Sequence, residues 1–373
     1  MSRARDFADL ASAYKGDAQL SNRNLIHNGD MTISQRGTSA TGVGASNGVA
    51  LLDRWSWSQS SNGRVTMTQE AVTDLSGFFH CLKVATTTAD TSIAAGEYVL
   101  LSQGIESRGG LTQRMKKGYS DAEKLTLSFW AKANASATYG LSLRDNDNDR
   151  TCNATFTVGT SWERHTITFP GDTSTGDKPG VDHNATITLY IWLHAGSTYN
   201  GGTFSNLTWA DTTWNTAVNS SNTSIYDATS RTFFITGVQL EVGEVATPFE
   251  HKSYEDNLAQ CQRFFYAVVP KAIGAESYFG NGFNYNSSVV MGFIHFPVTM
   301  RAVPTLEIQS GTNDWRLYRN GGNDELDDFY LNSANIKGMN IANNSDASGT
   351  AGHAGGLYFN DTTNCYLYIK AEL

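Results

Sequence analysis

The sequence predicts an all-β protein: an antiparallel jelly-roll β-sandwich, a short linking α-helix and a second, smaller β domain. Two observations support this fold class. From residue 24 to about residue 250, apolar residues recur at every second position, which is the period of a half-buried strand. Turn-forming tracts, without helical patterns between them, separate these segments, as in antiparallel sandwiches. The 373 residues are enough for two domains with their own cores.

Three segments of the first domain show the alternation most clearly. Residues 125–129, 187–193 and 234–242 each place apolar side chains on one face and mostly polar or aromatic ones on the other. Thr, Tyr and Trp suit the pleated surface of a strand. Residues 145–149 consist of Asp and Asn and predict a turn. We therefore place the sandwich over residues 24–252.

Residues 253–266 break the two-residue period and predict the linking helix. Ser253 suits the N-cap position, with Asp256 three residues later. The apolar face of this helix consists of Tyr254, Leu258, Cys261 and Phe265. An isolated helix of this length is marginal in water, so its apolar face must pack on a neighbour. The candidates are the sandwich, the next domain and the same helix in partner chains.

Strand patterns return after Pro270 and define the second domain, residues 267–373. The predicted strands are residues 289–296, 305–308, 315–318 and 365–369. Residues 335–356 are rich in Gly, Asn, Ser and Ala and predict long loops. Residues 323–328 are mostly acidic and predict a solvated turn.

The composition excludes several functional classes. The formal charge of −9 argues against nucleic-acid binding, which requires a concentrated basic surface. No apolar run reaches about 18 residues, so no segment is expected to enter a membrane. The N-terminal residues lack the apolar core of a secretory signal. The four cysteines form no CxxC pair and predict buried thiols in a reducing cytoplasm.

No motif indicates catalysis, a metal ion or a cofactor. Residues 144–150 place aspartates at alternating positions, but they lack the glycine and glutamate that complete a calcium loop, so a solvated hairpin turn is preferred. The eight histidines form no metal-binding pair, and no GxSxG, Walker or GxGxxG motif occurs. A glycosidase or lyase site built from carboxylates on distant strands stays open, because sequence spacing does not report that geometry.

Aromatic residues mark the candidate ligand-binding regions. The connection between residues 194 and 232 is long, and long irregular connections are often binding loops. Rings flanked by amides and hydroxyls suit sugars, because a pyranose stacks its apolar face while its hydroxyls form hydrogen bonds. The alternative is that the rings pack over the sandwich or in a subunit interface. The candidates are Tyr199, Trp209 and Trp214 in the connection, and Trp315 and Tyr318 in the second domain.

A series of motifs resembles the carbohydrate-binding-like jelly-roll domain of bacteriophage tail fibres of the marine phage type. The motifs are NLIHNGDMTISQRG (24–37), DRW (53–55), LTLSFWAK (125–132), SWER (161–164), ITGVQLEVG (235–243), ATPFE (246–250) and CQRFF (261–265). The last three are the most specific. Residues 296–305 and 371–373 resemble the C-terminal part of the same fibre proteins.

The resemblance implies a homotrimeric virion fibre on the tail or capsid, assembled in the bacterial host cytoplasm. Residues 1–23 would dock the chain to other virion proteins, the helix would bundle about the threefold axis, and residues 267–373 would form the distal tip. The implied function is non-enzymatic adhesion to host polysaccharide or lipopolysaccharide, with no cofactor, nucleic acid or membrane insertion. Two alternatives stay open: a virion-borne polysaccharide depolymerase, and a decorating capsid fibre that does not bind the host.

Overall fold

A computed structural model describes residues 22–44, 51–107, 111–270, 277–309, 311–359 and 365–373. The chain forms two compact units. The first comprises Met1–Thr32 and Thr38–Lys252, and the second comprises Ile33–Gly37 and Ser253–Leu373. The predicted virion-docking segment, residues 1–23, lies almost wholly outside the described residues. Among the described residues, no helix is long and apolar enough to cross a membrane.

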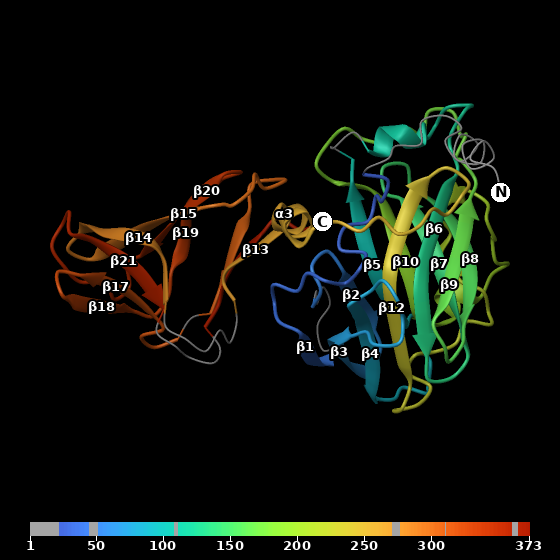
Figure 1. Cartoon of the computed structure of the whole chain (residues 1–373), viewed down its shortest axis with the longest axis horizontal. Coiled ribbons are helices and arrows are strands. Elements are labelled where there is room, and N and C mark those ends of the chain that lie inside the picture. Colours follow the sequence, from blue (N-terminus) through green and yellow to red (C-terminus); the bar gives the residue numbers. More distant parts are fainter. Residues whose placement is uncertain (1–21, 45–50, 108–110, 271–276, 310, 360–364) are drawn as a thin grey trace, which may run out of the picture. The chain divides into compact units, whose positions relative to one another are not determined.

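The first unit is a sandwich of two six-stranded antiparallel sheets (Figure 1), as the sequence predicts. The first sheet has the order β1 (Ser39–Val43), β3 (Arg64–Ala71), β4 (His80–Thr88), β12 (Thr232–Val242), β6 (Leu125–Ala133) and β9 (Glu163–Phe169). The second has the order β11 (Ala210–Asp211), β8 (Arg150–Val158), β7 (Ala137–Asp145), β10 (Ala185–Ala195), β5 (Tyr98–Glu106) and β2 (Ser56–Ser60). The three predicted alternating segments are parts of β6, β10 and β12.

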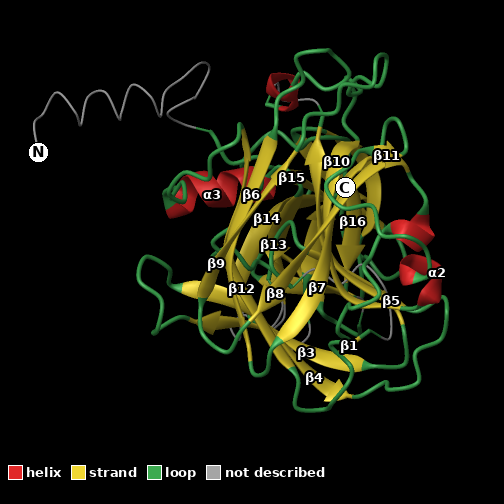
Figure 2. Ribbon diagram, turned by 90° about the vertical axis from the view of Figure 1, so that its right-hand side faces the viewer, coloured by secondary structure: helices red, strands yellow, loops and turns green. Residues whose placement is uncertain are grey.

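Helices are few and short in this unit (Figure 2). Among its described residues they are the 3-10 helix η1 (Thr112–Met115), the single turn α2 (Ser197–Asn200) and the 3-10 helix η2 (Trp214–Thr216). The last two lie in the long connection between β10 and β12. The core between the sheets is continuous and aromatic: Phe129 and Phe156 meet edge to face with ring centroids 5.0 Å apart.

The motifs that resemble tail fibres hold the sandwich together. Asn24 Nδ2 donates to the Val238 carbonyl at 3.0 Å, and Asn24 Oδ1 accepts from the Leu240 N–H at 3.0 Å. The first motif thus lies along β12, which carries the most specific motif. Trp55 is fully buried, and its Nε1 donates to the Asn28 carbonyl at 3.1 Å. We therefore assign these residues to the fold and not to ligand binding.

The second unit contains a three-stranded and a seven-stranded antiparallel sheet. The smaller has the order β13 (Phe265–Val269), β22 (Leu367–Lys370) and β16 (Thr305–Ile308). The larger has the order β18 (Gly322–Leu326), β17 (Trp315–Arg319), β21 (Ala354–Phe359), β14 (Ser277–Asn286), β15 (Val289–His295), β20 (Gly338–Asn343) and β19 (Tyr330–Asn335). This unit is the smaller β domain that the sequence predicts.

The linking helix is present but shorter than predicted. Helix α3 spans Tyr254–Gln262, and Ser253 Oγ accepts from the Asp256 N–H at 3.1 Å as its N-cap. The chain does not continue helical to residue 266, because Phe265 already pairs with Lys370 of β22. Of the predicted apolar face, Cys261 is buried, Leu258 is half-buried and Tyr254 is exposed. Phe265 is buried, but it lies in strand β13.

Two acidic or glycine-rich stretches predicted as loops contain strands. Strand β20 lies within residues 335–356, because Met339 and Ile341 point into the core while its backbone pairs with β15 and β19. Strand β18 covers most of residues 323–328. Its Asp324 is buried and accepts hydrogen bonds from Ser348, so this segment is not a solvated turn.

A short segment from the N-terminal part of the chain belongs to the second unit. The side chain of Gln35 bonds the open edge of β13: its Nε2 donates to the Phe265 carbonyl at 2.8 Å, and its Oε1 accepts from the Ala267 N–H at 3.3 Å. Arg36 lies 3.3 Å over the Phe265 ring and pairs with Glu372 at 2.7 Å. Residues 33–37 thus belong to the second unit, although they lie within residues 24–252, the predicted sandwich.

Candidate functional site

The second sheet of the first unit has one face in the core and one facing outward. In β10, Leu189, Ile191 and Leu193 are fully buried in the core, so Tyr190 points to the opposite face. Residues directly opposite in an antiparallel pair share a face. The register therefore places one row across five strands on the outer face: Asn153, Ser142, Tyr190, Ser102 and Ser56.

Two further rows flank this one on the same face. One consists of Thr155, Gly140, Trp192, Leu100 and Ser58, and the other of Thr151, Arg144, Thr188 and Gly104. The three rows together are defined here as the β5–β8 face. They are rich in hydroxyl groups, Asn153 adds one amide, and Arg144 is their one charged residue. The hydroxyls that are half-buried rather than buried are those of Ser56, Ser58, Ser102 and Thr155.

Aromatic rings gather at the Trp192 end of the β5–β8 face. The ring of Trp192 lies 5.3 Å from Tyr199 and 6.2 Å from Trp214, both in the connection between β10 and β12. Tyr190 lies 6.3 Å from Trp192, and Tyr98 lies 5.5 Å from Tyr199. Trp192 is buried, and the other four rings are half-buried. The structure thus brings two of the predicted candidates, Tyr199 and Trp214, into one cluster.

Polar groups border this ring cluster. Trp192 Nε1 donates to Ser142 Oγ at 2.9 Å, which fixes the indole against the sheet. The guanidinium carbon of Arg144 lies 4.9 Å from the Trp214 ring centroid, and its Nη2 pairs with Asp149 at 2.9 Å. Asn153 Oδ1 is buried and, within the described part of the chain, accepts no hydrogen bond. This oxygen keeps an unused acceptor capacity in the central row.

The other predicted ligand residues lie elsewhere. Trp209 packs against the sandwich core, and its Nε1 donates to the Pro170 carbonyl at 2.7 Å. Trp315 is fully buried in the second unit, and its Nε1 donates to the Gln309 carbonyl at 3.1 Å. Tyr318 is exposed on β17. Only Tyr199 and Trp214 therefore share a site.

Tyr190, Trp192 and Tyr98 are not among the ligand-binding residues predicted from the sequence. The first two had a usable signal, because they alternate with the four core residues of β10 and must face away from the core. What the sequence did not reveal is that the long connection returns to cover this face. That return is visible in the backbone, where the Leu207 N–H of the connection donates to the Asn153 carbonyl of β8 at 2.7 Å.

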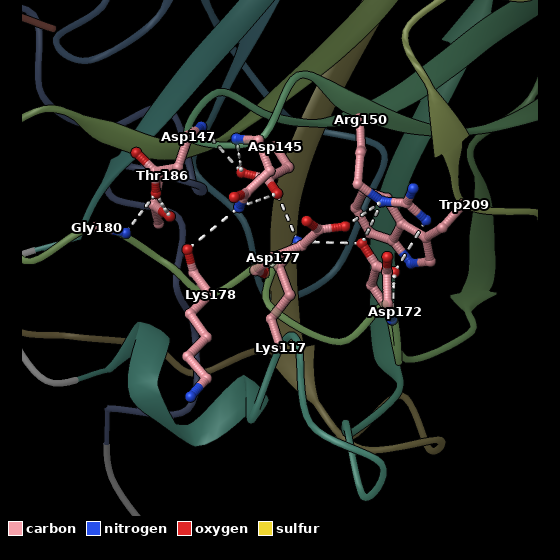
Figure 3. A network of polar contacts seen from close by, with 12 residues as sticks. Lys117, Asp145, Asp147, Arg150, Asp172, Asp177, Lys178, Gly180, Thr186 and Trp209 are labelled. Carbon is pink, nitrogen blue, oxygen red and sulfur yellow. Dashed lines mark hydrogen bonds and ion pairs between the residues drawn. The ribbon is translucent and has the colours of Figure 1, made fainter.

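The Asp-rich turn between β7 and β8 is a hairpin turn, but it is not simply solvated (Figure 3). Asp145 is fully buried, and its Oδ2 lies 2.5 Å from Lys117 Nζ. The same ammonium lies 3.0 Å from Asp172 and donates to the Asp177 carbonyl at 2.8 Å. Arg150 pairs with Asp172 at 2.9 Å. Two basic residues thus neutralise this network from within.

The ion pairs in this network shift the pKa of the Asp172 carboxyl group. Burial raises the pKa of Asp172, but hydrogen bonds from Arg150 and Lys117 outweigh it and hold that pKa below its ordinary value. Asp147 forms no ion pair with the described residues and instead accepts from the Gly180 N–H at 2.6 Å. Among the described residues, no group of three or more His, Cys, Asp or Glu side chains is arranged to hold a metal ion. The four cysteines are buried and form no disulfide.

No family model matches the chain, and no curated protein matches it. Among solved structures, the enzymatically active domain of tailspike protein 4 of bacteriophage CBA120 is 14% identical, with a TM-score of 0.31. That match covers 59% of this chain and 21% of the tailspike chain. A structure described as CBM4 is 14% identical over 58% of this chain and 99% of its own, with a TM-score of 0.29.

A family 11 carbohydrate-binding module from a cellulosomal cellulase of Clostridium thermocellum is 11% identical. The match covers 54% of this chain and 94% of the module, with a TM-score of 0.27. The solved structures that this chain is similar to thus include carbohydrate-binding modules and a phage tailspike domain. At identities and TM-scores this low, none of them assigns a family or a ligand to this chain.

Proposed function

We propose that this chain is a glycan-binding fibre protein of a phage virion, and that the β5–β8 face binds a host surface polysaccharide or lipopolysaccharide without cleaving it. The observation that carries the proposal is the ring cluster of Tyr190, Tyr199 and Trp214 beside a sheet face whose half-buried side chains are mainly hydroxyls. Rings supply stacking area for pyranose faces, and the half-buried hydroxyls supply donors and acceptors for sugar hydroxyls.

The charge of the face favours a largely uncharged stretch of glycan. Arg144 is already paired with Asp149, so the face offers little net charge to a ligand. The three rows contain no carboxylate, whereas glycoside hydrolysis requires two carboxyl groups flanking the scissile bond. The buried aspartates nearby, Asp145 and Asp172, are paired with Lys117 and Arg150. These features favour binding over depolymerisation.

The assignment to a virion rests on the motif series that resembles phage tail fibres. In that proposal the chain is a homotrimer, residues 1–23 attach it to other virion proteins, and the second unit forms the distal tip. Three copies of one weak glycan site act together, so avidity can exceed single-site affinity by orders of magnitude. Light scattering after size exclusion tests the trimer: a mass near three times 40.6 kDa is expected.

The glycan site is tested with an array of bacterial capsular polysaccharides and lipopolysaccharides. The purified chain is expected to bind a subset of the array and to compete with phage for host cells. Replacing Tyr190 and Trp214 by Ala should weaken array binding about tenfold, because each ring contributes about 0.5–1.5 kcal/mol beyond its buried area. Tyr119→Ala, an exposed tyrosine elsewhere in the first unit, is the matched control.

Each outcome separates the alternatives. Release of reducing ends from a bound polysaccharide would show that the chain is a depolymerase and not an adhesin. Absence of binding to the array together with undisturbed phage adsorption would favour a decorating fibre. Array binding whose affinity is unchanged after the loss of both rings would remove the β5–β8 face as the site.

A further inference from the structure

The seven-stranded sheet of the second unit carries exposed aromatic rings on the face opposite its core. Trp315 and Leu317 of β17 point into the core, as does Leu357 of β21. Tyr318 therefore points outward, and it is 43% exposed. Tyr278 of β14 is 58% exposed. The core of this sheet is complete without these two rings, so packing does not account for them.

The register extends this face into one row across five strands. Tyr318 (β17), Gly356 (β21), Asn281 (β14), Phe293 (β15) and Asn340 (β20) stand directly opposite one another. These strands lie side by side in Figure 1. Because neighbouring strands are about 4.8 Å apart, Tyr318 and Phe293 are about 14 Å apart across the sheet. Phe293 is 54% exposed, and the amide of Asn281 lies between the two rings.

The ring of Tyr278 packs directly on the backbone of Gly356. A Cβ on Gly356 would lie 2.5 Å from Tyr278 Cδ1, so the ring rests on bare backbone. Tyr358 lies beside it, with ring centroids 5.1 Å apart, and Arg316 lies 5.7 Å over the Tyr358 ring. Arg316 pairs with Glu325 at 3.3 Å, which balances the charge at this end of the row.

We propose that Tyr278, Tyr318, Asn281 and Phe293 form a second oligosaccharide-binding surface, the β17–β15 track, separate from the β5–β8 face. The rings offer stacking faces at both ends of the row, and Asn281 offers a donor and an acceptor for hydroxyls between them. The charges beside the row are paired, so the track matches a neutral glycan. Its length of about 14 Å requires an oligosaccharide rather than a single sugar.

A second copy of the chain fits this surface less well. Aromatic side chains bury about 150–250 Å² each when fully covered, so the exposed parts of Tyr278, Tyr318 and Phe293 amount to roughly 300 Å². A stable protein interface takes about 800 Å² from each partner and has a hydrophobic centre. Here two of the three rings carry hydroxyls, and an asparagine stands between them. These properties favour a sugar chain as the occupant.

The test uses the full chain in native gels that contain one neutral polysaccharide each: β-glucan, α-glucan, mannan, xylan or galactan. All variants carry Tyr190→Ala and Trp214→Ala, which remove the rings of the first face. At least one polysaccharide is expected to retard this background protein. Adding Tyr278→Ala and Tyr318→Ala should raise its dissociation constant about tenfold. Adding Tyr119→Ala instead should leave the constant unchanged.

A second variant distinguishes loss of the binding surface from loss of folding. Gly356→Ala keeps every ring, but its Cβ displaces the Tyr278 ring from the backbone of β21. It should therefore weaken binding with little change in the unfolding midpoint. Absence of retardation by all five polysaccharides in the background protein would overturn the track. So would retardation that survives the loss of both tyrosines, or a solution mass that falls in the tyrosine variants, which would indicate a second copy on this face. The background keeps this test separate from the failure of the first site.

Discussion

Replacing Lys117 by Met is expected to destabilise the first unit severely. Lys117 Nζ lies 2.5 Å from Asp145 and 3.0 Å from Asp172, and all three side chains are almost wholly buried. Met keeps most of the volume of the lysine but leaves the Asp145 carboxylate without its ion-pair partner. Removing one partner of a buried ion pair costs about 3–5 kcal/mol, because the other charge remains buried and uncompensated.

That loss is large against the whole stability of a domain, which is about 5–15 kcal/mol. For a domain of this size, 1 kcal/mol lowers the unfolding midpoint by about 2–4 °C. Lys117→Met should therefore lower the midpoint of the first unit by about 10 °C. The double variant Lys117→Met/Asp145→Asn should recover most of the loss, since the uncompensated carboxylate is then gone as well.

The assay is thermal unfolding followed by tryptophan fluorescence. Lys124→Met is the matched control: Lys124 pairs with Glu244 at 2.8 Å, but both side chains are exposed, so a loss of about 0–1 kcal/mol is expected. If Lys117→Met costs no more than Lys124→Met, or if the double variant is less stable than the single one, the buried network does not have the energetic role assigned to it.

Two further predictions concern the first unit. Burial lowers the pKa of His194 despite the opposing charge of Glu97, so the unfolded chain takes up this proton at a higher pH than the folded one. The free energy of unfolding should therefore fall as the pH drops from about 7 to about 5, and a His194→Gln profile parallel to the parent's would contradict this. Gly237 has a φ of 62°, and a Cβ there would lie 2.7 Å from Phe78 Cζ. Gly237→Ala should therefore lower the free energy of unfolding by more than the roughly 1–2 kcal/mol that left-handed strain alone costs. Gly42→Ala, with a φ of 64° and open space around it, isolates the strain in the same thermal unfolding assay.

Much of the fold follows from local patterns in the sequence. The alternation of residues 187–193 predicts a strand, and β10 covers it; residues 305–308 and 315–318 likewise fall in β16 and β17. Ser253, predicted as the N-cap of the linking helix, is the N-cap of α3. Such features depend on period and capping, which neighbouring residues determine. Apolar Met339 and Ile341 also alternate with polar or small residues, as in a strand. The Gly- and Asn-rich composition around them led instead to the prediction of a loop.

Other features depend on residues distant in the chain. No residue near Asp145 in the sequence indicates that Lys117, just after η1, neutralises it, so the turn was expected to be solvated. Likewise, Tyr190 and Trp214 become neighbours of Trp192 only because the connection folds back over the sheet. Local sequence reports which face of a strand a residue occupies, but it does not report which other segment covers that face.

The exchange of residues 33–37 into the second unit has a consequence for how this chain is divided or recombined. A fragment cut at residue 253 would lose Gln35, leaving the Phe265 carbonyl and the Ala267 N–H on an open strand edge. It would also lose the Arg36 partner of Glu372. The two units are therefore not interchangeable modules joined by a single linker. A functional graft of the second unit onto another sandwich must carry five residues from the start of the first.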